Sequence, residues 1–85
     1  MQTSGEVATL SDVLNYVVHL RPEPEGGYTV LVPALPPVVS YGETYEEALA
    51  NAREAIELIL SVYRDEGIEI PNDTGTRVEN LTIAA

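Results

Sequence analysis

The sequence predicts a small α+β domain in which one long helix covers one face of a short antiparallel sheet. Two alternating segments, residues 16–21 and 28–32, flank a proline- and glycine-rich turn, and apolar residues recur at helical spacing from residue 45 to residue 63. The 85 residues suffice for a single domain over residues 1–85 with a thin core. We expect disorder at residues 1–9, which are mostly small and polar.

The turn PEPEGG, residues 22–27, predicts a hairpin between the first two strands. Prolines cannot donate to a strand ladder, and glycines adopt positive φ at little cost. Both strands carry apolar residues on each face, since Val17 opposes Val18 and Val30 opposes Leu31. One helix can cover only one of these faces, so we expect self-association through the other face and through unpaired sheet edges.

The prolines of PALPP, residues 33–37, should take the chain out of the sheet before a third strand at residues 38–42. Thr44 is the predicted helix N-cap, with Glu47 completing a capping box, and Gly67 is the predicted C-cap. Beyond a loop at residues 71–76, the alternation of residues 77–84 predicts a fourth strand parallel to the first.

Negative charge dominates the composition. Fourteen acidic residues, four arginines and no lysine give a net charge of −10. This charge disfavours direct binding of nucleic acid or an anionic membrane and favours encounter with a basic protein. Alternatively, it only keeps a small domain soluble. The lack of cysteine excludes disulfides and thiolate metal sites, and the lack of a signal peptide or long apolar run predicts a cytoplasmic protein.

No catalytic, metal or cofactor site is predicted from the residues. His19 is the only histidine and stands in no nucleophile motif, so a packing or surface role is favoured. The glutamates of the helix lie mainly opposite its apolar stripe, which is typical of a solvated face. These observations favour a binding or structural protein over an enzyme.

Residues 25–60, EGGYTVLVPALPPVVSYGETYEEALANAREAIELIL, resemble the HicB antitoxin family. The shared features are an E-G-G-Y turn entering a strand, V-P-x-L-P closing it, and G-x-T-x-E-E-A-L-x-N-A-x-E-A-I over residues 42–56. The sequence departs from the family at Ala34, Pro37 and Val38, where an acid, a glycine and often a cysteine are usual.

The resemblance implies a truncated ribonuclease H-like fold, βββαβ, with the strands in the order third, second, first, fourth. A nuclease of that fold would hold metal with acids on the first strand and the helix, but the first strand here has Val17, Val18 and His19. The resemblance therefore implies an antitoxin with no enzymatic activity, which binds and neutralises a small basic HicA-type RNA-cleaving toxin. Many members also carry a C-terminal DNA-binding segment, for which we expect no room beyond residue 85.

Two other functions remain open. The chain could be a solitary HicB-like structural or regulatory oligomer with no toxin partner. It could also be a degenerate hydrolase, which the missing acids disfavour. A basic toxin encoded beside this chain would separate the antitoxin from the solitary oligomer.

Five residues are candidates for partner binding. Glu23 and Glu25 at the hairpin tip, and Glu43 and Glu46 around the helix start, should steer a basic partner. Leu35 should add an apolar contact from a loop that its prolines already order. We also expect the chain to form a homo-oligomer, a dimer or larger.

Overall fold

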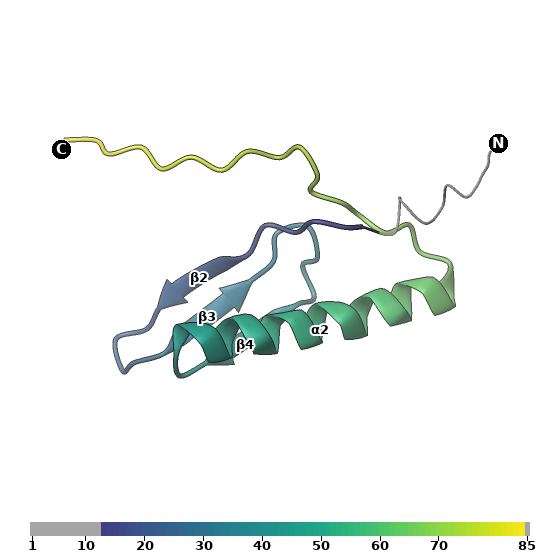
Figure 1. The fold of residues 1–85 in the computed structure, drawn as a ribbon, viewed down its shortest axis with the longest axis horizontal. Helices are drawn as coiled ribbons and strands as arrows, with labels where there is room; N and C mark the ends of the chain where they lie inside the picture. The colour runs from purple at the N-terminus through teal and green to yellow at the C-terminus, as the bar shows by residue number, and fades with distance from the viewer. Residues whose placement is uncertain (1–12, 85) are drawn as a thin grey trace.

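A computed structural model describes residues 13–84 and places three strands and one helix in them (Figure 1). The elements are β2 (His19–Pro22), β3 (Tyr28–Leu31), β4 (Val39–Gly42) and α2 (Tyr45–Glu66). The sheet order is β2-β3-β4, and both neighbouring pairs are antiparallel. The predicted α+β class, hairpin and third strand are confirmed. The disorder expected at residues 1–9 concerns residues outside the described part of the chain.

Helix α2 begins and ends at the predicted caps. Thr44 Oγ1 accepts a hydrogen bond from the Glu47 backbone N–H at 3.1 Å. Glu47 Oε1 in turn accepts from the Glu43 N–H at 2.6 Å, one residue earlier than in a standard capping box. At the other end Gly67 is left-handed, with φ 69°, and the Ile68 N–H donates to the Tyr63 carbonyl at 2.8 Å. Local hydrogen bonds therefore set both helix boundaries.

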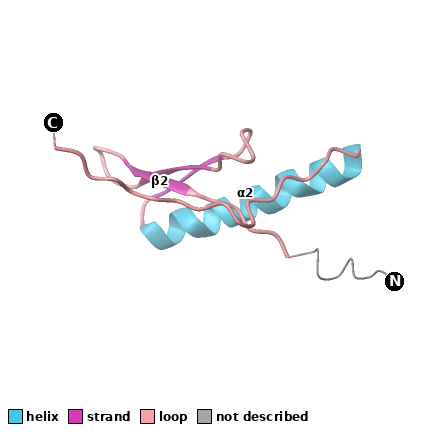
Figure 2. Ribbon diagram, turned by 90° about the horizontal axis from the view of Figure 1, so that it is seen from above, coloured by secondary structure: helices cyan, strands magenta, loops and turns pink. Residues whose placement is uncertain are grey.

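The core lies between α2 and one face of the sheet (Figure 2). Ala48 and Ala52 are buried against Val30 of the central strand, because small side chains let the helix approach closely. A second cluster, formed by Val32, Leu35, Val38 and Leu60, extends the core along the C-terminal half of the helix. Burial on this face agrees with the predicted helical stripe.

The proline-rich crossover belongs to this core. The Leu35 N–H donates to the Val32 carbonyl at 2.9 Å and the Val38 N–H to the Leu35 carbonyl at 2.8 Å, so the crossover is two consecutive turns. Pro33 and Pro36 occupy the second position of each turn, which their fixed φ favours. The three-residue spacing buries the side chains of Val32, Leu35 and Val38 together.

The residues after α2 return along the segment that precedes β2. The Asp73 N–H donates to the Asn15 carbonyl at 2.9 Å, and Asp73 Oδ2 accepts from the Val17 N–H at 2.9 Å. Beyond Gly75 the chain is extended and exposed (Figure 1). Residues 77–84 pair with no strand in the described structure, so the predicted fourth strand is not confirmed.

Gly42 lies at the end of β4, where the first turn of α2 packs closely against it. It is buried, and a methyl group added there would overlap backbone atoms of Ala48 and Glu47. Because these are backbone atoms, they cannot swing aside as a flexible side chain can. We expect Gly42→Ala to lower the free energy of unfolding by about 1–3 kcal/mol, as overpacking does elsewhere. Urea unfolding measures this loss, and an unchanged midpoint would contradict the close approach.

Tyr16 joins the segment before β2 to the segment after α2, because its hydroxyl donates to the Pro71 carbonyl at 2.5 Å. Burial and then the charge of Asp73 raise the pKa of Tyr16 above its ordinary 10.0, while Arg64 acts in the opposite direction. The folded chain therefore holds this proton more tightly than the unfolded chain. Its contribution to stability is complete below pH 10.0 and is lost as the pH rises through the raised pKa.

We expect Tyr16→Phe to lower the free energy of unfolding by about 1 kcal/mol at neutral pH, because the hydrogen bond is lost. The variant should then lose less stability than the wild type as the pH rises above 10.0. Urea unfolding of both chains at neutral and alkaline pH measures the difference. Equal alkaline losses would show that Tyr16 does not carry the effect.

Candidate functional site

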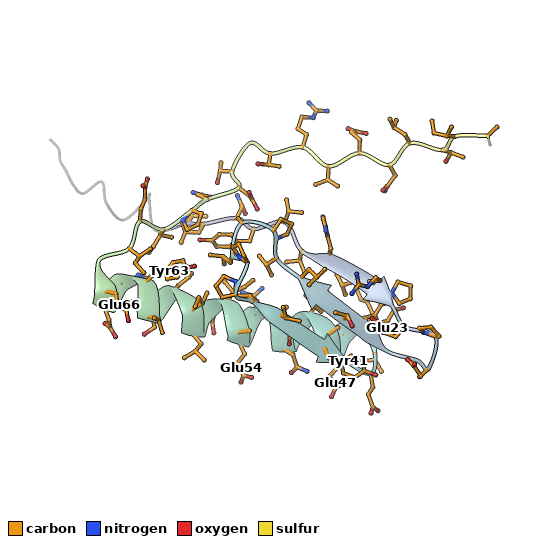
Figure 3. All side chains as sticks on the ribbon, turned by 180° about the vertical axis from the view of Figure 1, so that it is seen from behind. Glu23, Tyr41, Glu47, Glu54, Tyr63 and Glu66 are labelled. Atoms are coloured by element: carbon orange, nitrogen blue, oxygen red, sulfur yellow. The ribbon has the colours of Figure 1, made fainter. Side chains whose placement is uncertain are left out.

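Four of the predicted partner-binding residues gather at one end of the molecule. β2 ends at Pro22 and β3 begins at Tyr28, which pairs with Gly42 at the end of β4. The hairpin tip and the start of α2 therefore lie at the same end of the sheet. Figure 3 shows Glu23 and Glu47 at this end and Glu66 at the other. We name the five residues of this surface the acidic end: Glu23, Glu25, Glu43, Glu46 and Glu47.

The five carboxylates differ in whether they already form hydrogen bonds or ion pairs within the chain. Thr29 Oγ1 donates to Glu23 Oε2 at 2.5 Å, and Arg21 Nε lies 3.7 Å from the same oxygen. Glu47 is engaged at the helix start, as described above. The remaining three, Glu25, Glu43 and Glu46, are exposed and form no ion pair within residues 13–84. These three carboxylates are available to a partner.

Tyr41 links the parts of the acidic end. Its hydroxyl donates to the Gly26 carbonyl at 3.0 Å, and its backbone carbonyl accepts from Asn51 Nδ2 of α2 at 2.7 Å. A side chain on Gly27 would overlap the Tyr41 ring. These roles of Tyr41 are not predicted from the sequence, although the paired glycines and the asparagine of the family motif are signals for them. The hairpin tip, β4 and α2 are thus held in one arrangement.

The charge of the acidic end suits a cationic partner. Five glutamates against Arg21 leave a net charge of 1 − 5 = −4 over this surface. The positive end of the α2 dipole offsets only part of the charge on Glu46 and Glu47. Within residues 13–84, no three acidic or histidine side chains are grouped to hold a metal ion, and no helix is long and apolar enough to span a membrane.

Leu35 does not belong to this surface. Its side chain is 0% exposed and packs against Val32, Val38 and Leu60. The expectation that Leu35 makes an apolar contact with a partner is therefore wrong in this structure. The two turns of the crossover direct it inward, while Pro33, Pro36 and Pro37 are exposed.

The sheet face opposite α2 is a second accessible surface. Because Val30 packs on α2, its strand neighbour Leu31 points to the opposite face. Val39 pairs with Leu31 and is 62% exposed, and Tyr41 on the same face is 46% exposed. This arrangement agrees with the two apolar faces expected from the alternation.

A groove of about 530 Å³ lies between α2 and the segment that leads into β2. Apolar side chains from both elements line it, including Leu14, Val18, Leu49 and Ile56, together with Arg53 and Arg64. This groove is not predicted from the sequence, because it forms between two segments far apart in the chain. The helical stripe was a signal, since Leu49 belongs to it and is still 38% exposed.

The profile of the HicB-like antitoxin of bacterial toxin–antitoxin systems matches residues 16–84 of this sequence. The match includes the hairpin, the crossover and all of α2. The chain therefore belongs to the HicB-like antitoxin family, which confirms the resemblance found in the sequence.

Individual relatives fall into two groups. A UPF0150 protein of Thermoplasma acidophilum is 35% identical over 72 residues, which are 85% of this chain and 100% of the relative. A UPF0150 protein of Synechocystis is 38% identical over 65 residues, 76% of this chain and 82% of the relative. Antitoxin HicB of Escherichia coli K12 is 36% identical over 58 residues, 68% of this chain and 42% of the antitoxin. The chain thus matches most or all of these UPF0150 proteins but less than half of that antitoxin.

Proposed function

We propose that this protein binds and neutralises a small basic HicA-type RNA-cleaving toxin, as an antitoxin without enzymatic activity. Its family membership supports an antitoxin role. The acidic end is the observation that supports a basic partner. Three exposed carboxylates, those of Glu25, Glu43 and Glu46, lie together on a surface with few competing cations.

Neutralisation would follow from charge complementarity. A protein that cleaves RNA needs cationic side chains to hold phosphate groups. The acidic end would attract the same side chains, speed the encounter and cover them. The chain itself would contact no nucleic acid, since its own net charge is −10. It would need no cofactor and would work in the cytoplasm.

The proposal includes a fold and an assembly. The fold is a single HicB-like domain of truncated ribonuclease H type over residues 1–85, with residues 77–84 forming the fourth strand when assembled. The observed order β4-β3-β2 agrees with the third, second and first strands of that arrangement. The assembly is a homo-oligomer, supported by the exposed Val39 and Tyr41 on the uncovered sheet face.

Coexpression with a small basic protein encoded beside this chain tests the antitoxin role. Expression of the basic protein alone should stop growth, and coexpression should restore growth and yield a complex that survives purification. The catalytically inactive toxin serves as the control for toxicity. Continued growth arrest with both proteins soluble would contradict the proposal.

A second candidate is a solitary HicB-like structural or regulatory oligomer without a toxin. The match covers all 72 residues of the Thermoplasma UPF0150 protein, so a relative consisting of this domain alone exists, as this candidate requires. It predicts a stable homo-oligomer and no growth effect from any basic neighbour. The same coexpression experiment therefore separates the two candidates.

A further inference from the structure

Strand β2 forms an open edge of the sheet. Within the described chain it pairs only with β3, so the backbone groups on its other side lack a strand partner. Open edges bind extended segments by adding a strand. The groove beside the segment that leads into β2 also exposes apolar surface of Leu49 and Ile56. This side of the molecule offers both backbone hydrogen bonds and an apolar site.

Residues 77–84 have the properties of the strand that this edge lacks. The segment is extended, and its apolar residues Val78, Leu81 and Ile83 are 58%, 83% and 77% exposed. Arg77 and Glu79 lie 3.9 Å apart and cancel in charge. In a chain of net charge −10, a neutral apolar segment is the part that can approach a second copy with least repulsion.

A turn directs this segment away from its own sheet. The Thr76 N–H donates to the Asp73 carbonyl at 2.8 Å, and the Thr74 N–H donates to Asn72 Oδ1 at 3.0 Å. Gly75 supplies the positive φ, 92°, at the third position of the turn. Beyond this turn, residues 77–84 pair with no strand of their own chain in the described structure. Figure 1 shows this segment extending clear of β2.

We propose that residues 77–84 of one copy bind as a strand along the β2 edge of a second copy, with Leu81 and Ile83 in the adjoining groove. The exchange is reciprocal, so a two-fold dimer closes with both edges and both segments occupied. This proposal rests on the self-association proposed above and is independent of toxin binding.

Cross-linking distinguishes exchange between copies from pairing within one chain. Because the sequence has no cysteine, introduced thiols react alone. A mixture of His19→Cys chains and Asn80→Cys chains, treated with a short bismaleimide, should give a covalent heterodimer. Glu54→Cys on the helix replaces His19→Cys in the control, which should give little product. If the double variant His19→Cys/Asn80→Cys links only within one chain, the exchange is overturned.

Sedimentation of the Leu81→Ser/Ile83→Ser variant tests the apolar contacts. Each dimer loses four buried side chains, so the dimer Kd should rise at least tenfold, while Leu58→Ser, at a 68% exposed helix position, should leave it unchanged. If the double substitution leaves the dimer Kd unchanged, the strand exchange is wrong, although the chain still self-associates. A wild-type chain that stays monomeric at micromolar concentration would overturn both.

Discussion

Replacing Leu35 with alanine is expected to lower the free energy of unfolding by about 2–5 kcal/mol. The Leu35 side chain is 0% exposed and lies among Val32, Val38 and Leu60, where its truncation leaves a cavity. A domain typically has only about 5–15 kcal/mol of stability, so this loss would be a large fraction of the total. Urea unfolding followed by circular dichroism measures it.

The matched control is Leu58→Ala on the exposed side of α2. Leu58 is 68% exposed, so this substitution should change the free energy of unfolding by less than about 0.5 kcal/mol. Any effect of Leu35→Ala on toxin dissociation should disappear once the folded fraction is taken into account. A normally stable Leu35→Ala chain that releases toxin faster would instead restore Leu35 as a surface contact.

Reversing charge at the acidic end is expected to slow association with the proposed basic toxin by about tenfold at low salt. Glu25→Lys/Glu43→Lys is the informative double variant, because both carboxylates are exposed and neither forms an ion pair in the described chain. Glu23 is less suitable, since it accepts from Thr29 and its loss would disturb the hairpin. Stopped-flow association at several salt concentrations should also show a flatter salt dependence.

A second double variant, Glu54→Lys/Glu66→Lys, keeps the same change in net charge but places it near the middle and at the far end of α2 (Figure 3). It should slow association much less than the variant at the acidic end. Equal slowing by both variants would mean that only the overall charge matters. Unchanged association in the first variant would exclude the acidic end as the steering surface.

The elements that the sequence predicts well depend on local interactions. Thr44, Glu47 and Gly67 define the ends of α2 through bonds to residues at most four positions away. The hairpin follows from its turn, with two glycines at positive φ. Such contacts can be predicted from the sequence because the residues that make them are close together in it.

Features that depend on tertiary packing were predicted less well. Leu35 is predicted to contact a partner because prolines order the loop that holds it, yet the three-residue spacing from Val32 to Val38 buries it. The gathering of Glu25 and Glu43 at one end comes from the pairing of Tyr28 with Gly42, which is a matter of strand register. The alternation of residues 77–84 predicts a fourth strand but cannot show the turn before it. A backbone hydrogen bond from Thr76 to Asp73 and a hydrogen bond to the side chain of Asn72 form that turn.

The hydrogen bond from Asn51 Nδ2 to the Tyr41 carbonyl makes the two edges of the sheet unequal. It occupies a main-chain acceptor of β4, the strand at the opposite edge from β2. A sheet that accepts strands at both edges can grow without limit, which is how fibrils begin. Here growth at the β4 edge would first have to break a bond to the helix. The same asparagine that fastens α2 to the sheet should therefore protect the protein against fibrillar aggregation at high concentration.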